Sequence, residues 1–300
     1  MAGETNDKRG QNIQKQPRRL KIKEIATRAV AGVIYILLIL LGVLGGRFTF
    51  LLVFGSILGI ALFEFYRMVE KKMSHVISKA FNIASGVLLF LSVFLYMEGL
   101  CAYALPVIIL LYLLALIAAA IFLRRDDILH STIYSGFGQI YITMPLSLLM
   151  FLSYTDTVRD SGNYNWLPVL ALFVFIWVND TAAYFFGSLI GKRKLLEHVS
   201  PKKSVEGFIA GIIFTVLASL LFAHLYPAYS TLVWIGFAIV VSLFGTVGDL
   251  FESLIKRTFG VKDSGNLIPG HGGILDRIDS LLIAAPAALL YLNIIYYFAV

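Results

Sequence analysis

Long apolar stretches dominate the chain and are interrupted only briefly by polar residues. Several are about the length that crosses a bilayer, roughly 20 residues. They lie near 29–46, 48–67, 80–97, 101–123, 131–152, 166–190, 204–225, 231–251 and 280–299. The pattern therefore predicts an all-α, polytopic integral membrane protein with about nine transmembrane helices.

The breaks between the early stretches are short, and the stretches themselves carry few interior polar groups. Gly45, Gly46 and Arg47 separate the first two, and Glu98 and Gly99 separate the third and fourth, so both pairs are expected to be tight hairpins. Gly55 and Gly59 in the second stretch form a small-xxx-small pair, which favours close helix packing. The bare apolar helices also leave room for a homodimer.

Composition supports the membrane interpretation. Hydrophobic residues make up 59% of the chain, charged residues only 14%, and the mean hydropathy is +0.83. An ordinary soluble domain is excluded, because too little polar surface exists to cover it. The single cysteine, Cys101, cannot form an internal disulfide and is expected to be a small core residue.

The positive charges predict the orientation. If the nine spans alternate, 23 Lys and Arg residues fall on the side of the N-terminal tail, and only Arg47 and Arg159 fall on the other. Positively charged loops stay in the cytoplasm, so the N-terminus is expected to be cytoplasmic and the C-terminus outside, in the cell (inner) membrane. This topology, and not nucleic-acid binding, accounts for the net charge of +7.

Three regions follow from this layout. Residues 1–28 form a basic cytoplasmic tail, residues 29–153 hold about five membrane helices, and residues 154–300 hold about four helices with longer cytoplasmic loops. Chemically active residue types gather in the last region, mainly between residues 245 and 280.

Two polar helix faces lie within residues 245–280. If the apolar helix before them continues, residues at offsets 0, 3, 4 and 7 share one face: Asp249, Glu252, Ser253 and Lys256. A second face stands just before the last apolar run: Asp276, Asp279 and Ser280. Both faces are expected to line a site at the membrane surface.

The carboxylates inside predicted spans include Asp180 and Glu64. A carboxylate costs about 2.5–3.5 kcal/mol at the centre of a spanning helix, so it usually faces a bundle interior or cavity and has a function there. This favours a functional role for Asp180, which follows Asn179 in the sixth helix. Glu64 stands within a turn of Arg67 near the interface, so an ordinary ion pair or a snorkelling carboxylate is expected.

The loop 191–208 is the second basic concentration. Its first three cations, Lys192, Arg193 and Lys194, are explained by topology and attraction to anionic lipid. The segment 200–204, with Glu206 and Gly207 following, is expected to begin a helix and to bind phosphate there through backbone N–H groups and two ammonium groups. Its members are Ser200, Pro201, Lys202, Lys203 and Ser204.

His271 is the histidine most expected to face a ligand, because glycines at 270, 272 and 273 let the backbone approach closely. No Cys/His spacing supports zinc. The carboxylates instead form an oxygen-rich set that suits Mg²⁺ with phosphate: Asp180, Asp249, Glu252, Asp263, Asp276 and Asp279. Acids beside many cations predict phosphoryl or nucleotidyl transfer.

The motif at 253–279 resembles that of the phosphatidate cytidylyltransferases, also called CDP-diglyceride synthetases. It reads SLIKR, four residues, KDSG, then IPGHGGI and DRID. Asn179–Asp180 and the Ser200–Ser204 segment with Glu206 and Gly207 are similar to further motifs of that family, with Ser204 where many members have Thr. The resemblance implies the reaction CTP + phosphatidate → CDP-diacylglycerol + pyrophosphate, dependent on Mg²⁺ and carried out at the cytoplasmic face.

Site roles can be assigned on this basis. The leading metal ligands are Asp249 and Asp276, with Asp180 and Asp279 as further candidates, and a second cation is left open. Catalytic roles are expected for Asp249, Lys256, Arg257, His271, Asp276 and Arg277. Substrate-binding roles are expected for Asn179, Ser200, Lys202, Lys203, Ser204, Glu206, Lys262, Asp263, Gly270, Gly272 and Gly273.

Two other functions were weighed. A CDP-alcohol phosphotransferase would also be acid-rich, Mg²⁺-dependent and membrane-bound, but its DG…AR…G…D…D pattern is absent. An ion-coupled transporter would bind cations at Asp180 and Asp249 near the midplane, but no internal repeat is evident and the charges cluster at one mouth.

Overall fold

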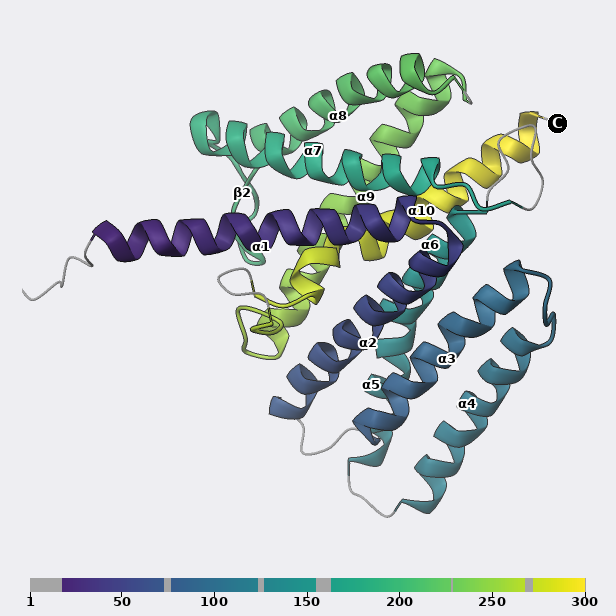
Figure 1. Cartoon of the computed structure of the whole chain (residues 1–300). Coiled ribbons are helices and arrows are strands. Elements are labelled where there is room, and N and C mark those ends of the chain that lie inside the picture. Colours follow the sequence, from purple (N-terminus) through teal and green to yellow (C-terminus); the bar gives the residue numbers. More distant parts are fainter. Residues whose placement is uncertain are drawn as a thin grey trace, which may run out of the picture.

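The computed structural model describes residues 18–72, 77–123, 127–154, 163–227, 229–267 and 272–299 (Figure 1). His271 and Gly270 lie outside these ranges, so their predicted roles stay predictions. The elements in chain order are α1 (Arg18–Leu44), α2 (Arg47–Lys72), α3 (Lys79–Met97), α4 (Ala104–Phe122), α5 (Ile128–Gly138), the π-helical turn η1 (Gln139–Thr143), α6 (Met144–Leu152), α7 (Leu167–Ile190), β1 (Lys194–Leu196), β2 (Ser200–Ser204), α8 (Val205–Leu225), α9 (Thr231–Thr258) and α10 (Leu275–Ala299).

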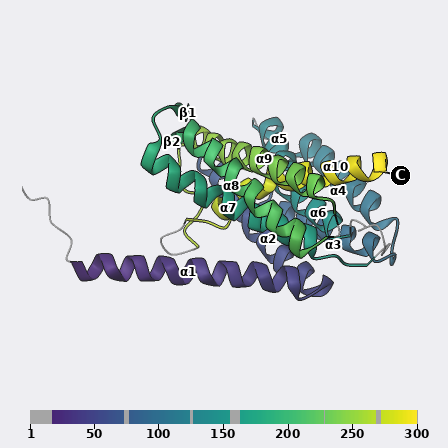
Figure 2. The ribbon, with the colours of Figure 1, turned by 90° about the horizontal axis from the view of Figure 1, so that it is seen from above.

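The all-α, polytopic prediction is confirmed. Within the described ranges, 8 helices are long and apolar enough to cross a membrane, with α5, η1 and α6 counted as one stretch. The first predicted span corresponds to Ala29–Leu44 in α1, a shorter apolar segment. Helix α1 runs along one flank of the bundle (Figure 2), and much of its apolar surface is exposed.

The hairpin between α1 and α2 is as tight as predicted, because Gly46 turns the chain with a φ of 92° that favours glycine. The connection from α3 to α4 is longer than predicted. It occupies residues 98–103 and includes Gly99 with a φ of 69°. The two helices still pack side by side (Figure 1).

The interior of the first helices is more polar than the sequence suggested. We call Tyr66, Asn82, Tyr112, Ser135 and Gln139 the neutral cluster; all five are buried. Gln139 Nε2 donates to the Asn82 carbonyl at 2.7 Å, and Tyr112 donates to Asn82 Oδ1 at 3.0 Å. Tyr66 also donates to the Ser135 carbonyl at 2.7 Å, so the contacts join α2, α3, α4, α5 and η1. The expectation of few interior polar groups was wrong, because single residues scattered over these five elements converge only when the helices pack.

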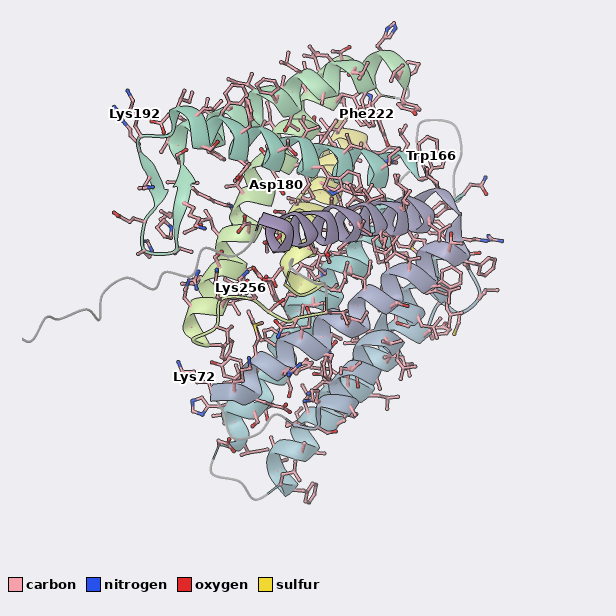
Figure 3. The ribbon with its side chains drawn as sticks, turned by 60° about the vertical axis from the view of Figure 1, so that its left-hand side comes forward. Lys72, Trp166, Asp180, Lys192, Phe222 and Lys256 are labelled. Atoms are coloured by element: carbon pink, nitrogen blue, oxygen red, sulfur yellow. The ribbon has the colours of Figure 1, made fainter. Side chains whose placement is uncertain are left out.

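The basic ends of several helices meet at one end of the bundle. Lys72 Nζ, at the end of α2, donates to the Thr258 carbonyl, at the end of α9, at 2.8 Å. Figure 3 shows Lys72, Lys192 and Lys256 toward this end, and Trp166, just before α7, toward the other. The helix ends that carry the motif therefore share one end of the molecule with the basic loops.

The pairs α7 with α8 and α9 with α10 form the packing core of the C-terminal half. Helix α8 begins at Val205, and its N-cap residue Ser204 accepts a hydrogen bond from the N–H of Gly207 at 3.2 Å. The expected helix start at Ser200 was wrong. Residues Ser200–Ser204 instead pair as strand β2 with β1, in antiparallel register, and carry the chain back to α8.

Candidate active site

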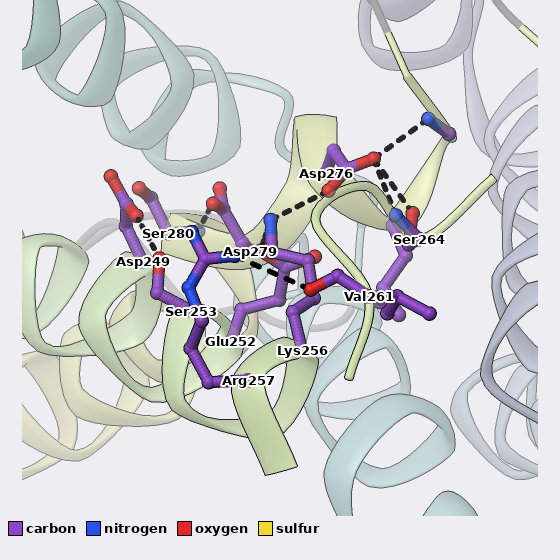
Figure 4. A network of polar contacts seen from close by, with 12 residues as sticks. Asp249, Glu252, Ser253, Lys256, Arg257, Val261, Ser264, Asp276, Asp279 and Ser280 are labelled. Carbon is purple, nitrogen blue, oxygen red and sulfur yellow. Dashed lines mark hydrogen bonds and ion pairs between the residues drawn. The ribbon is translucent and has the colours of Figure 1, made fainter. Parts of the chain in front are cut away.

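A buried ammonium group lies at the centre of the site, where α9 meets α10. Lys256 Nζ forms ion pairs with Glu252 Oε2, one turn earlier, and with Asp276 Oδ1 at 2.6 Å (Figure 4). The Lys256 side chain is only 12% exposed and that of Glu252 is fully buried. The predicted shared faces of α9 and α10 are confirmed, and they face each other. One cation thus stands between two carboxylates.

Asp276 also anchors the loop before α10. Its Oδ2 accepts hydrogen bonds from the Ser264 N–H at 3.0 Å, from Ser264 Oγ at 2.9 Å and from the Gly273 N–H at 2.8 Å. Gly272 adopts a φ of 80°, and a side chain there would meet the Asp276 carboxylate. Both oxygens of Asp276 are therefore engaged by groups of the protein itself.

Asp249 lies one turn before Glu252 and connects α9 to the β-hairpin. Lys203 Nζ of β2 lies 2.6 Å from Asp249 Oδ2, and Ser253 Oγ donates to Asp249 Oδ1 at 3.4 Å. Both members of the Lys203–Asp249 pair remain partly exposed, with side-chain exposures of 27% and 30%. Lys202, the preceding residue in the strand, is exposed. The structure brings Lys203 into the site and leaves Lys202 outside this pair.

Two more carboxylates lie near Asp249. Asp180 of α7, labelled in Figure 3, and Asp279 of α10 are close enough to Asp249 for their charges to repel it. Asn179 donates to Asp180 Oδ1 at 3.5 Å and packs its own amide oxygen against Gly211 of α8. Three acids from three helices thus concentrate negative charge beside Lys203.

These acids fit a magnesium site that substrate completes. Within the described ranges, no group of three or more His, Cys, Asp or Glu side chains is placed to hold a metal by itself. Mg²⁺ is usually bound by one or two carboxylates together with substrate phosphates and waters, so a complete protein cage is not required. Asp249 suits this better than Asp276, because it is more exposed and accepts fewer hydrogen bonds.

Other predicted residues take local structural roles. Ser204 caps α8, as described above. The Glu206 carboxylate accepts the N–H groups of Lys192 and Arg193 at 3.0 and 3.2 Å, which closes the base of the hairpin. Arg257 donates to the Val261 carbonyl at 3.4 Å. Their substrate-binding or catalytic roles stay predictions.

The remaining predicted residues lie in three places: the segment after α9, the first turn of α10 and strand β2. Lys262, Asp263 and Arg277 are exposed, and Ser200 is half-buried in β2. The Arg277 carbonyl accepts a hydrogen bond from Tyr35 of α1 at 3.1 Å. The contact of Tyr35 could not be predicted from the sequence, because a tyrosine in an apolar run is typical of any membrane helix.

Glu64 of α2 also contacts the site, from outside the motif region. The expected pairing with Arg67 or exposure at the interface was wrong: Glu64 is 4% exposed and accepts the N–H of Leu275 at 2.9 Å and the Ser264 hydroxyl at 3.3 Å. Glu64 therefore bonds to residues far along the chain, and not to the nearby Arg67. A functional role for Glu64 could have been predicted by the argument applied to Asp180, because both are carboxylates within a spanning segment.

Comparison with known proteins identifies the family of the chain. The sequence profile of the cytidylyltransferase family matches residues 26–295. The chain belongs to the cytidylyltransferase family. A phosphatidate cytidylyltransferase of Bacillus subtilis (strain 168) is 32% identical over 266 residues, which cover 88% of this chain and 96% of the relative. One of Staphylococcus aureus (strain COL) is 36% identical over 185 residues, 60% of this chain and 69% of the relative.

A third relative, the phosphatidate cytidylyltransferase of Staphylococcus saprophyticus, is 37% identical over 180 residues, 59% of this chain and 67% of that protein. The resemblance inferred from the motif is thus confirmed. The family profile also reaches into α1, whose Tyr35 contacts the site, so the membership is not limited to the C-terminal motif region.

Proposed function

We propose that this protein transfers the cytidylyl group of CTP to phosphatidate, giving CDP-diacylglycerol and pyrophosphate. The family and the named relatives favour this activity over a CDP-alcohol phosphotransferase or a transporter. The single observation that carries the proposal is the charged site on α9 and α10, where acids and cations alternate at one end of a membrane bundle. Such an end can receive a lipid phosphate and a water-soluble nucleotide together.

The reaction needs little proton transfer from the protein. A phosphate oxygen of phosphatidate attacks the α-phosphorus of CTP, the bond from that phosphorus to the bridging oxygen breaks, and pyrophosphate leaves. The attacking phosphate is already ionised near neutral pH, so positioning and charge neutralisation carry the rate. Lys203 stands at the entrance beside Asp249 and is the cation best placed to meet incoming phosphate.

A bound Mg²⁺ would neutralise phosphate charge and stabilise the charge that develops during transfer. Asp249, with Asp180 and Asp279 nearby, would hold it together with the substrate phosphates. The fixed position of Asp249 relies on its bonds to Lys203 and Ser253. This magnesium role, and any second cation, are part of the proposal.

We also propose that the site faces the cytoplasm of a cell membrane. The site shares its end of the bundle with the basic residues Lys72 and Lys192, and such basic ends are retained on the cytoplasmic side. The orientation is tested by adding CTP to the outside of sealed membrane vesicles of known orientation. Activity with external CTP should appear in inside-out membrane vesicles and be absent from sealed right-side-out vesicles until detergent is added.

The activity itself is tested with purified protein in detergent, phosphatidate, Mg²⁺ and CTP labelled at the α-phosphorus. Label should enter the chloroform-extractable lipid, whereas CTP labelled at the γ-phosphorus should give only water-soluble pyrophosphate. Replacing phosphatidate by diacylglycerol, which lacks the attacking phosphate, should abolish incorporation. If folded, monodisperse protein leaves the lipid phase unlabelled with phosphatidate, the proposed function is wrong.

A further inference from the structure

Glu64 lies in α2, outside the motif, yet its side chain belongs to the loop that precedes α10. The carboxylate is buried, and its two hydrogen-bond donors are 200 and 211 residues away along the chain. Burying an ionisable group in a membrane helix is costly, so its contacts are expected to have a function. These contacts connect the N-terminal helices to the site.

The first contact caps a helix. Leu275 is the first residue of α10, and its N–H is one of the groups at a helix start that has no partner within the helix. Glu64 Oε2 accepts it at 2.9 Å. A carboxylate is also favoured there by the positive end of the helix dipole. Glu64 therefore fixes the point at which α10 begins, one residue before Asp276.

The second contact passes through a shared hydroxyl group. Ser264 Oγ lies 3.3 Å from Glu64 Oε2 and 2.9 Å from Asp276 Oδ2. A hydroxyl has one hydrogen to donate, so Ser264 serves the two carboxylates alternately. Since Asp276 Oδ1 binds Lys256, a continuous polar path runs from Glu64 to Lys256.

The loop is shaped to admit this carboxylate. A side chain on Gly265 or on Gly273 would collide with the Glu64 carboxyl group, and Gly273 also sits against Ser264 Oγ. The backbone can pass so close only because neither residue has a Cβ atom. Glu64 thus contacts the described loop on both sides, at 264–265 and at 273–275.

We infer that Glu64 is a positioning residue of this site: it holds Ser264 and the start of α10 so that Asp276 stays directed at Lys256. This inference rests on the proposed function. Glu64 makes no contact with Asp249, Lys203 or Asp180 among the described residues, so it acts through the loop and through Asp276.

Three variants test the inference. Glu64→Ala removes the acceptor, Glu64→Gln keeps an oxygen of the same reach, and Glu70→Gln is the matched control. Glu70 is an acid on the same helix and is ion-paired with Lys79 at 2.6 Å, away from the loop. Each is assayed for kcat and for the KM of CTP, and for folding by thermal unfolding in detergent.

Glu64→Ala should lower kcat by about 10-fold to 100-fold with the KM for CTP changed less than about threefold, because misplaced catalytic groups slow the chemical step more than substrate binding. Glu64→Gln should recover most of that loss, and Glu70→Gln should match the parent protein. Glu64→Ala with a parental kcat, or an equal loss in Glu70→Gln, would overturn the inference. So would a loss in Glu64→Ala that appears as KM alone.

A second measurement does not need activity. Lys262 is exposed just before the anchored Ser264, so trypsin cleavage after Lys262, mapped by mass spectrometry, reports how firmly the loop is held. Glu64→Ala should be cut several times faster, and Glu70→Gln at the parental rate. If the parent protein makes no labelled lipid but this difference appears, the proposed function fails while the anchoring role stands. Equal cleavage rates would contradict the anchoring role itself.

Discussion

The molecule contains two polar clusters inside apolar helices, and they differ in charge and in exposure. The neutral cluster on α2 to η1 is closed: Asn82 alone bonds to Ile77, Ser135, Tyr112 and Gln139. The charged cluster, which we define as Lys203, Asp249, Glu252, Lys256 and Asp276, is open at Lys203 and Asp249. Both consist of polar groups that lipid cannot solvate.

The difference indicates which cluster is structural and which is chemical. In the neutral cluster each polar atom has found a protein partner, so nothing is left for a ligand. In the charged cluster Glu252 and Lys256 pair in the interior, whereas Lys203 and Asp249 pair where phosphate and metal could reach both charges. Polar residues in membrane helices thus indicate a site only where their charge remains accessible.

The largest effect is expected from breaking the buried ion pairs. Lys256→Met removes the ammonium group and leaves the Glu252 and Asp276 carboxylates without their counter-charge, which costs about 3–5 kcal/mol of stability. Thermal or denaturant unfolding in detergent should show this loss, together with loss of turnover. Lys256→Arg, which keeps the charge, is the control. A fully stable Lys256→Met protein would contradict the pairing.

Asp249→Asn should have the next largest effect, but on turnover and not on folding. The amide is isosteric, and the site loses one negative charge beside Lys203. We expect kcat to fall about 100-fold, which corresponds to about 2.7 kcal/mol, because charge that is positioned for the transition state is lost. The rate is measured at saturating Mg²⁺, and unfolding should be unchanged. Near-normal turnover would exclude Asp249 as a metal ligand.

Asn82→Ala probes the neutral cluster and should give the opposite result. It removes several buried hydrogen bonds at once, so stability should fall by about 2 kcal/mol. Turnover per folded molecule should stay within about twofold, since Asn82 bonds only to residues between 77 and 139 in the described part of the chain, away from the charged cluster. Unfolding and kcat are measured on the same preparation. A large fall in kcat without a fall in stability would remove the distinction between the clusters.

The smallest effect is expected from Lys194→Ala. Lys194 is exposed in β1 and makes no ion pair among the described residues. Surface charges of this kind contribute about 0–1 kcal/mol, so unfolding and turnover should both remain within about twofold of the parent protein. Lys203→Ala, on the neighbouring strand β2, is the comparison variant and should lower turnover more than Lys194→Ala does, because Lys203 is paired with Asp249. Equal losses in the two variants would mean that the whole hairpin acts through bulk charge.

Much of the fold could be predicted because membrane helices are long and apolar. The predicted span 204–225 corresponds to α8 at Val205–Leu225, and 166–190 to α7 at Leu167–Ile190. Hydropathy fixes such segments locally, without knowledge of their neighbours. The shared faces of α9 and α10 could also be predicted, because helical spacing alone sets them.

What could not be predicted depends on contacts between distant segments. Glu64 has an obvious partner three residues away, yet it bonds to Ser264 and Leu275. The Ser200–Ser204 segment has a serine and a proline typical of a helix start, yet it pairs with β1 because the chain must return from α7 to α8. Local sequence patterns indicate which conformations a segment can adopt, but they do not show which distant residues it will contact once the chain has folded.

The bond from Lys72 to the Thr258 carbonyl has a consequence for how relatives can exchange parts. It joins the last residue of α2 to the last residue of α9, so a helix of the N-terminal half contacts a helix of the C-terminal half at this surface. A chimera with a crossover between α6 and α7 would combine an α2 from one parent with an α9 from another. Such a hybrid should be more stable when the end of its α2 is replaced by the sequence of the parent that supplied α9.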